Sequence, residues 1–377
     1  MQKKVLIVDD SALMRRVLSD IINSDERFHV TKLATNGLEA LNLLIQDKEE
    51  VDAIILDINM PKMGGLDFLK RLEQENLKVI VIVVSTIAKD GAKETIDALE
   101  HGAFDFVTKP ENFMDVKNDR FKNNILNCLS LALKLSPATY QSAVVPTSQV
   151  APKLIKEHKR EQIQEPSKEQ IKEPMVQFQR TKRDNQKKLV AIACSTGGPK
   201  ALQRIIPLLP EKMGCSVLIV QHMPVGFTAS LANRLNELSK IQVQEAVDGE
   251  ILRDDVVYIA KGGNQMRIES QGGNNRITLT SEPARNGLRP CADIMYESLA
   301  GLDYDEITCV VLTGMGSDGT QGIKRLKEKN NIYVIAQEET SCTVYGMPKV
   351  VVDNGLANEI ITLDKVASAI TKNSGVH

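Results

Sequence analysis

The sequence predicts an α/β protein with two doubly wound parallel sheets joined by a polar linker. Short apolar runs alternate with stretches of helical apolar spacing, first in residues 1–135 and again in residues 188–377. This alternation is typical of parallel sheets that carry helices on both faces. In residues 136–187 the apolar periodicity fades, and Gln, Lys, Glu and Pro dominate. We therefore expect two folded domains, 1–135 and 188–377, with a flexible charged linker, 136–187, between them.

Composition narrows the class of protein further. The formal net charge of −2 gives no basic bias, which disfavours nucleic acid as a partner. No apolar run approaches the length of about 18 residues that a membrane span needs, and the N-terminal MQKKVLIVDD lacks the apolar core of a signal peptide. The six cysteines are scattered without a CxxC pair, so we expect reduced thiols, no zinc site and a cytoplasmic location.

Strands and helices alternate five times in the first domain. The expected strands are Val5–Val8, His29–Leu33, Ala53–Leu56, Val79–Val84 and Phe104–Val107. The expected helices are Ala12–Asn23, Asn36–Gln46, Leu66–Gln74, Gly91–His101 and Val116–Leu133. Ser11 stands directly before the first helix, where its hydroxyl can serve as the N-cap.

Polar residues follow four of these strands, at the edge where parallel sheets bind ligands. They are Asp9 and Asp10, Asp57, Ser85 and Lys109. Crowded carboxylates raise one another's pKa unless a cation lies between them, and oxygen ligands beside a phosphate suit Mg²⁺. Asp57 is then a nucleophile for phosphoryl transfer, Lys109 can pair with the phosphoryl group, and Ser85 can hydrogen-bond to it. Any one of these residues could be an ordinary polar residue in a loop at a strand end, but their convergence on one edge of the sheet disfavours that interpretation.

The motifs VDDSALMRR, LDINMPKMGGLDFL, VVST and FVTKP resemble the receiver domain of two-component response regulators over residues 1 to about 125. The resemblance implies a flavodoxin-like fold and phosphorylation of Asp57 by a histidine kinase. It implies a Mg²⁺ site formed by Asp9, Asp10, Asp57 and the carbonyl of Asn59. Ser85 corresponds to the switch hydroxyl and Lys109 to the receiver lysine.

The linker contains an internal repeat, because EQIQEP at 161–166 recurs as EQIKEP at 169–174. Such a segment cannot bury enough apolar surface to offset the entropy lost on ordering, which predicts a tether. The alternative is a docking site for a partner at Met175–Phe178.

The second domain is again predicted as α/β, with a small antiparallel hairpin. The expected strands are Leu189–Cys194, Cys215–Val220, Val256–Ala260, Cys309–Leu312 and Tyr333–Ala336, with Met266–Glu269 and Arg276–Leu279 as the hairpin. The expected helices are Lys200–Ile206, Thr228–Leu238, Ile294–Leu302, Gly322–Glu328 and Lys365–Lys372.

The stretch LVAIACSTGGPK at 189–200 organises this domain. It reads as a buried strand that runs through Ser195 into a helix, which brings the hydroxyl near helix N-terminal amides that can stabilise an oxyanion. Ser195 could instead be a simple N-cap. A phosphate-binding turn is a second alternative, although GxxxxGK[ST] is absent. Cys194 could be a nucleophile, but it fits better as the last buried residue of the strand.

Ser195, His222 and Asp318 each follow an apolar strand of this domain, so the same edge rule brings them together. A serine nucleophile needs a base, and the base needs a carboxylate to orient it. His222 is the only imidazole available, because three of the five histidines lie outside this domain and His377 is the last residue. His222 could instead be a core or turn histidine held by backbone hydrogen bonds, and Asp318 could be the N-cap of the helix after Gly319. The motif GxSxG is also missing. The pattern favours a serine hydrolase.

The motifs ACSTGGPKAL, VQHMPVGFTASLANRLN, DGEILRDDVVYIA, VVLTGMGSDGTQG and SCTVYGMP resemble the catalytic domain of the chemotaxis protein-glutamate methylesterases. The resemblance implies a Rossmann-like hydrolase domain with Ser195 as nucleophile, His222 as base and Asp318 as its orienting carboxylate. Thr196 and Met315 then line the site, and amides near Met315 bind the oxyanion. No cofactor is implied for this site.

The two resemblances together imply a phosphorylation-activated enzyme, protein-glutamate methylesterase and protein-glutamine glutaminase. It demethylates glutamyl methyl esters and deamidates glutamines on chemoreceptors, giving adaptation in chemotaxis. We expect a monomer that reaches the membrane only through receptors. The alternatives are a response regulator whose second domain binds a partner without catalysis, and a nucleotide-binding module at Ser195–Lys200.

Overall fold

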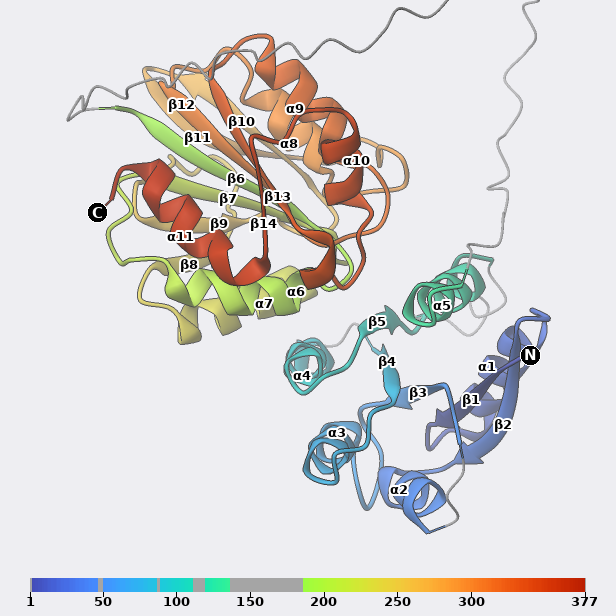
Figure 1. Ribbon diagram of the computed structural model, residues 1–377. Helices are drawn as coiled ribbons and strands as arrows, with labels where there is room; N and C mark the ends of the chain where they lie inside the picture. The colour runs from blue at the N-terminus through green and yellow to red at the C-terminus, as the bar shows by residue number, and fades with distance from the viewer. Residues whose placement is uncertain (1, 47–49, 87–88, 111–118, 136–185, 377) are drawn as a thin grey trace, which may run out of the picture. The chain divides into compact units, whose positions relative to one another are not determined.

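Two separate parallel sheets form the framework of the protein (Figure 1). The computed structural model describes residues 2–46, 50–86, 89–110, 119–135 and 186–376. The predicted linker therefore lies outside the described residues, apart from its last two positions. Met1–Ala138 and Gln186–His377 belong to one compact unit.

The first sheet has the strand order β2-β1-β3-β4-β5, and all its neighbouring strands are parallel. Its strands are β1 (Lys3–Val8), β2 (Phe28–Ala34), β3 (Ala53–Asp57), β4 (Ile80–Ser85) and β5 (Asp105–Thr108). The helices are α1 (Ala12–Asn23), α2 (Gly37–Ile45), α3 (Gly65–Gln74), α4 (Lys89–Glu100) and α5 (Asp119–Ala132). This order is the flavodoxin-like doubly wound arrangement, as the sequence predicts.

Alternating apolar side chains give the first sheet two buried faces. Val5 and Ile7 face the apolar stripes of α1 and α5, whereas Leu6 and Val8 face α2, α3 and α4. Helix α1 begins where predicted, because the Ser11 hydroxyl accepts a hydrogen bond of 3.3 Å from the amide of Met14.

The second sheet has seven parallel strands in the order β14-β13-β12-β6-β7-β9-β8. The strands are β6 (Lys188–Cys194), β7 (Ser216–Gln221), β8 (Gln242–Glu245), β9 (Val256–Ile259), β12 (Glu306–Val311), β13 (Ile332–Gln337) and β14 (Glu359–Ile361). The chain starts at β6, builds one half of the sheet outward through β7, and then builds the other half from β12. The strand order therefore reverses between β6 and β12, where doubly wound sheets place their sites.

Helices cover both faces of this sheet, with α6, α7 and α11 on one face and α8, α9 and α10 on the other (Figure 1). They are α6 (Gly198–Ile205), α7 (Phe227–Leu238), α8 (Ala292–Ser298), α9 (Thr320–Lys327), α10 (Met347–Asp353) and α11 (Leu363–Ser374), with the short 3₁₀ turns η2 (Ile206–Leu208) and η3 (Glu339–Ser341). The predicted antiparallel hairpin is formed by β10 (Gln265–Gln271) and β11 (Asn274–Thr280). No helix in the described part of the chain is long and apolar enough to cross a membrane.

Candidate active site

Ser195 is the first residue after β6 and lies on a tight turn into α6. The turn is closed by the Gly198 amide, which donates to the Ser195 carbonyl at 2.7 Å, and the Ser195 amide donates to the Thr313 carbonyl at 3.0 Å. Gly197 caps α6 with φ +78°, a left-handed conformation that favours glycine. The turn therefore holds the Ser195 backbone between two strand ends.

Cys194 precedes Ser195 but points into the core. Its side chain is fully buried, and its Sγ contacts the Val220 carbonyl at 3.8 Å. Burial raises the pKa of this thiol far above its ordinary value, so it stays protonated. These observations do not support Cys194 as a nucleophile.

His222 and Asp318 form a close pair beside this turn. His222 directly follows β7, and its amide donates to the Cys194 carbonyl at 3.2 Å. The His222 Nε2 lies 2.7 Å from the Asp318 Oδ2, with only 9% and 3% of the two side chains exposed. Asp318 lies in the turn between β12 and α9. Because Nε2 is engaged with Asp318, Nδ1 is the ring nitrogen left for a substrate or nucleophile.

The carboxylate of Asp318 is surrounded by hydrogen-bond donors. Oδ1 accepts from the Cys291 thiol at 3.1 Å and from the amides of Asp293 and Gly319 at 2.9 and 3.0 Å. Oδ2 accepts from the Ala292 amide at 2.6 Å as well as facing His222. Burial alone would raise the pKa of Asp318, but the bond to His222 and these donors hold it well below its usual range. The carboxylate therefore remains charged at neutral pH.

A cleft of about 530 Å³ brings the predicted residues together. Its lining includes Ser195, Thr196, His222, Met315 and Asp318. Met315 is 43% exposed and forms part of the rim. No hydrogen bond between the Ser195 hydroxyl and His222 is found among the described residues.

Two polar residues that the sequence analysis did not single out tie the loops of this cleft together. Gln221 donates from Nε2 to the carbonyls of Ser195 and His222, at 3.1 and 3.2 Å. Thr313 donates to the Thr196 carbonyl at 3.0 Å and accepts from the Val344 amide at 2.9 Å. Both side chains are buried at the ends of strands, which is the signal that could have found them.

The first domain has its own polar cluster at the carboxyl ends of its strands. Carboxylate oxygens of Asp9, Asp10 and Asp57 all lie within 4.8 Å of one another. The Lys109 Nζ lies 2.9 Å from the Asp9 Oδ2 and 2.8 Å from the Asp57 Oδ2. Asp10 is exposed while Asp9 and Asp57 are buried, so the cluster opens to solvent on one side. Three carboxylates at this spacing are a donor set that suits Mg²⁺.

Charge and burial compete in this cluster. Burial raises the pKa of Asp57, and Asp9 adds to the rise, while Lys109 opposes it. Burial alone would lower the pKa of Lys109, but Asp57 and Asp9 outweigh it and raise the value. Lys109 thus remains a cation between two buried carboxylates.

The other two predicted residues of the first domain lie at the same edge. Ser85 is buried at the end of β4, and its hydroxyl donates to the Gly91 carbonyl at 3.2 Å. Asn59 is exposed and lines a surface depression together with Asp10. Within the described ranges, no hydrogen bond joins Ser85 to Asp57.

Comparison with known proteins assigns each of the two domains to a family. Residues 190–370 match the family model for CheB methylesterase, and residues 5–119 match the model for the response regulator receiver domain. A protein-glutamate methylesterase/protein-glutamine glutaminase from Halalkalibacterium halodurans is 40% identical over 369 residues, which cover 98% of this chain and 97% of that protein. A Bacillus subtilis protein of the same name is 39% identical over 372 residues, with coverage of 98% and 97%. The catalytic domain of Thermotoga maritima CheB methylesterase is 38% identical, covering 50% of this chain and 98% of that one, with a TM-score of 0.48.

Fold and site define the class: a two-domain α/β protein in which a response regulator receiver domain precedes a hydrolase-type domain. The chain belongs to the family of protein-glutamate methylesterases/protein-glutamine glutaminases.

Proposed function

We propose that the protein hydrolyses glutamyl methyl esters, and deamidates glutamines, on methyl-accepting chemoreceptors, giving adaptation in chemotaxis. The observation that carries this proposal is the 2.7 Å pair of His222 and Asp318 in a cleft that Ser195 lines. An imidazole that a carboxylate orients, close to a serine, is the arrangement that acyl transfer by a serine nucleophile requires. The full-length relatives supply the substrate class.

Ser195 is the proposed nucleophile. Its oxygen attacks the γ-carbonyl carbon of the methyl ester, and His222 takes the hydroxyl proton at Nδ1. His222 then donates that proton to the departing methoxide, which leaves as methanol. Water attacks the resulting acyl-enzyme with His222 again as base, and glutamate and free Ser195 are released. A glutamine side chain follows the same steps, with ammonia as the leaving group.

Asp318 and the rim of the cleft complete the proposed machinery. Asp318 stabilises the protonated imidazole and fixes its orientation. The Met315 amide has no acceptor in the described part of the chain, which suits it to bind the oxyanion. Thr196 lines the cleft beside the nucleophile. The hydrolase site requires no cofactor in this mechanism.

The receiver domain is proposed to control the hydrolase through phosphorylation of Asp57 by a histidine kinase. Asp9, Asp10, Asp57 and the Asn59 carbonyl would hold Mg²⁺, which offsets the negative charge of the phosphoryl group. Lys109 lies within 2.8 Å of Asp57 and can pair with that group. Ser85 is the proposed switch hydroxyl, which must leave the Gly91 carbonyl to reach a phosphorylated Asp57.

In the unphosphorylated protein, the receiver is proposed to cover the cleft. Two contacts within the compact unit support this proposal. Asp105 and Phe106 of β5 line the same cleft as Ser195, and the rings of Phe106 and Phe227 stack with centroids 4.7 Å apart. Phosphorylation can shift the balance toward an open state only by its differential effect on the two states.

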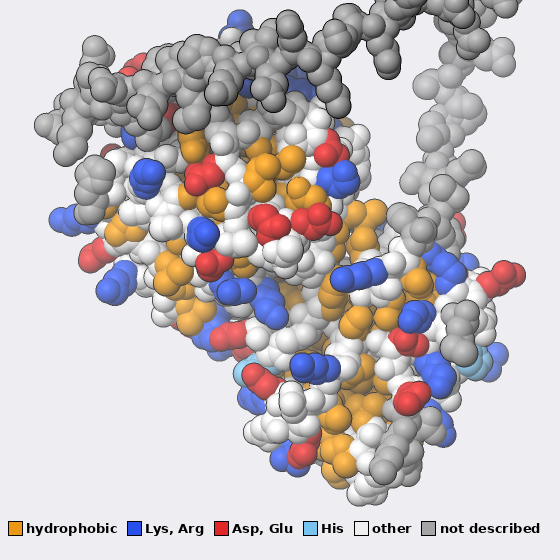
Figure 2. Space-filling model, viewed as in Figure 1, with side chains coloured by type: hydrophobic (Ala, Val, Ile, Leu, Met, Phe, Trp, Pro, Cys, Tyr) orange, Lys and Arg blue, Asp and Glu red, His pale blue; other side chains and the backbone are white. Residues whose placement is uncertain are grey.

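The remaining proposals concern location and partners. On the face shown in Figure 2, Lys and Arg side chains are interspersed with Asp and Glu, which offers no basic patch for nucleic acid. We propose a cytoplasmic monomer that meets the membrane only through its receptor substrates.

The test is methanol release from methylated chemoreceptor membranes, with and without Mg²⁺ and a small phosphoryl donor. The full chain is expected to release methanol faster with the donor. Ser195→Ala abolishes release, and Asp57→Ala abolishes only the stimulation. The exposed Ser368→Ala and Asp20→Ala are the matched controls and behave as wild type. Wild-type protein that releases no methanol with donor present would overturn the proposal in favour of partner binding without catalysis.

A further inference from the structure

The Asp318 carboxylate has a side-chain donor other than His222, and that donor is a thiol. Cys291 Sγ lies 3.1 Å from Asp318 Oδ1, the oxygen that does not face His222. Cys291 is fully buried and is the N-cap residue of α8. It reaches the site from the segment between the β10–β11 hairpin and α8. This segment is a different part of the chain from the turns that supply Ser195, His222 and Asp318.

The thiol is positioned by a second buried residue. The Gln265 Oε1 accepts from the Cys291 amide at 2.8 Å, and the Gln265 Nε2 donates to the Leu288 carbonyl at 3.0 Å. Gln265 itself is fully buried in β10. The backbone of Cys291 is therefore fixed on the side facing the hairpin, and its side chain is directed at Asp318.

Toward Asp318 the thiol acts as the donor. Burial, followed by the nearby charge of Asp318, raises the pKa of Cys291 to about 12. Its proton therefore stays on sulfur at neutral pH, and the charged oxygen beside it is the acceptor. A buried neutral thiol next to a carboxylate is unsuited to be a nucleophile.

We infer that Cys291 is a positioning residue for the reaction: its thiol hydrogen bond fixes the Asp318 carboxylate and draws charge away from the oxygen that faces His222. This inference rests on the proposed function for its kinetic consequence. Loss of the bond leaves more negative charge on Oδ2, which favours the protonated imidazole. It also frees the carboxylate to rotate, so His222 is less well oriented toward Ser195.

The experiment compares Cys291→Ala and Cys291→Ser with wild type and with Cys309→Ala in the full chain. Cys309 is another fully buried cysteine of this domain, and its strand position in β12 lies away from Asp318 contacts. Methanol release is followed against pH in the presence of Mg²⁺ and phosphoryl donor. Cys291→Ala is expected to lower kcat about tenfold, as for loss of a hydrogen bond to a charged group, with KM unchanged. The acid limb of its profile moves to higher pH.

Serine retains an O–H donor, so Cys291→Ser is expected to recover most of kcat and the wild-type acid limb. Cys309→Ala reports the cost of removing a buried thiol, and its pH profile should stay that of wild type. An NMR titration of the His222 ring in the same proteins is the second readout, because it requires no substrate. The His222 signals of Cys291→Ala should titrate at higher pH than those of the other three proteins.

The outcomes separate the two proposals. An active wild type with Cys291→Ala unchanged, or with Cys291→Ser as impaired as Cys291→Ala, overturns the role of Cys291 alone. An inactive wild type overturns the proposed function, and the NMR titration then still decides whether the thiol acts on His222 through Asp318. Identical His222 titrations in all four proteins would overturn the inference.

Discussion

Asp318 keeps its charge inside the protein because each of its oxygens is occupied by donors. A buried carboxylate without partners would be protonated or would destabilise the fold. Here backbone amides from the first turn of α8 and from the turn before α9, a thiol and His222 all stabilise the charged form. The residue is therefore both the proposed orienting group of the active site and a source of stability.

The low pKa of Asp318 predicts a specific loss of stability in acid. The folded pKa lies below the unfolded value of about 3.9, so the stabilising contribution is fully present above that value. It is lost as pH falls toward the folded pKa. Asp318→Asn is expected to flatten the dependence of the free energy of unfolding on pH below about 4. Urea unfolding at several pH values measures this, and parallel curves for the variant and wild type would contradict it.

Lys109 has a comparable role in the receiver domain, because its ammonium group pairs with the two buried carboxylates of Asp9 and Asp57. Lys109→Met leaves Asp9 and Asp57 facing each other, and we expect a loss of about 3 kcal/mol in the free energy of unfolding at pH 7 without Mg²⁺. Lowering the pH should reduce the loss, because the pKa of Asp57, already raised, lets that carboxyl take up a proton. Mg²⁺ should also recover part of it.

Denaturant unfolding of the full chain measures that difference, with the exposed Lys93→Met on α4 as the control. A Lys109→Met protein as stable as the control, with or without Mg²⁺, would show that the two carboxylates do not depend on the lysine.

The sequence alone could bring the principal candidate residues of the site together, but it could not identify the residues that hold them in place. Ser195, His222 and Asp318 follow apolar strands, and the rule that strand ends meet at one edge is enough to bring them together. Cys291 and Gln265 could not be found this way. Cys291 precedes a short helix and Gln265 begins a hairpin strand, and only tertiary packing brings Cys291 to Asp318 and Gln265 to Cys291.

At the scale of elements, the sequence predicted the central strands better than the edges. The central strands are long apolar runs because they are buried on both faces. The missed strands are β8, with the sequence QVQE, and β14, which has three residues. Helix α10 was missed as well; it follows Gly346 directly and has seven residues. Short elements at an edge need less apolar surface, so they leave little periodicity to detect.

The turns after β6 and β12 pack against each other with no space for a side chain. A Cβ on Gly314 would lie 2.5 Å from the Met347 sulfur and 2.8 Å from the Ser195 Cβ. Gly314→Ala is therefore expected to cost about 1–3 kcal/mol of stability. It should also displace Ser195 and lower methanol release about 100-fold.

Gly214→Ala is the control for that substitution. Gly214 has φ +65° and open space around its Cα, so alanine there adds backbone strain without touching the site. Its stability should fall while its activity remains. Equal activity of the two variants would mean that the turns can move apart without disturbing Ser195.

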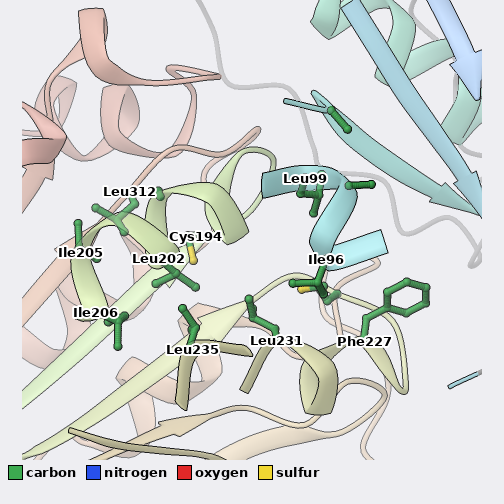
Figure 3. Close-up of a cluster of buried hydrophobic side chains, with 14 of the residues drawn as sticks. Ile96, Leu99, Cys194, Leu202, Ile205, Ile206, Phe227, Leu231, Leu235 and Leu312 are labelled. Atoms are coloured by element: carbon green, nitrogen blue, oxygen red, sulfur yellow. The ribbon is translucent and has the colours of Figure 1, made fainter. Parts of the chain in front are cut away.

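At the scale of the whole molecule, the elements next to the proposed phosphorylation residues also contact the hydrolase domain. Ile96 and Leu99 of α4 lie in one buried cluster with Leu202 of α6 and with Leu231 and Leu235 of α7 (Figure 3). Helix α4 follows Ser85, and β5 precedes Lys109. If the proposed switch holds, we expect a change at Ser85 or Lys109 to reach, over a short distance, the receiver residues that line the cleft.

An ion pair at the margin of this cluster allows the covering arrangement to be tested without removing the receiver. Arg234 Nη2 of α7 lies 2.8 Å from Glu100 Oε2 at the end of α4, with 29% and 37% of the two side chains exposed. A pair this exposed contributes less than about 1 kcal/mol, so its loss can shift the closed–open balance by about fivefold at most. Glu100→Arg, which places two cations together, should raise methanol release without phosphoryl donor by about two- to fivefold.

Reversing both charges of the Glu100–Arg234 pair tests whether the change in basal release comes from this ion pair. Arg234→Glu alone should also raise basal release, because it faces Glu100 with a second carboxylate. The double variant, Glu100→Arg with Arg234→Glu, restores attraction and should return basal release toward wild type. High salt should raise basal release in wild type and reduce the differences among the variants, because the exposed charges are screened. Asp353→Lys, which breaks the exposed pair with Lys349 on α10, controls for charge alone. If the increases in basal release of the two single variants add up in the double variant instead of cancelling, this contact does not hold the receiver over the cleft.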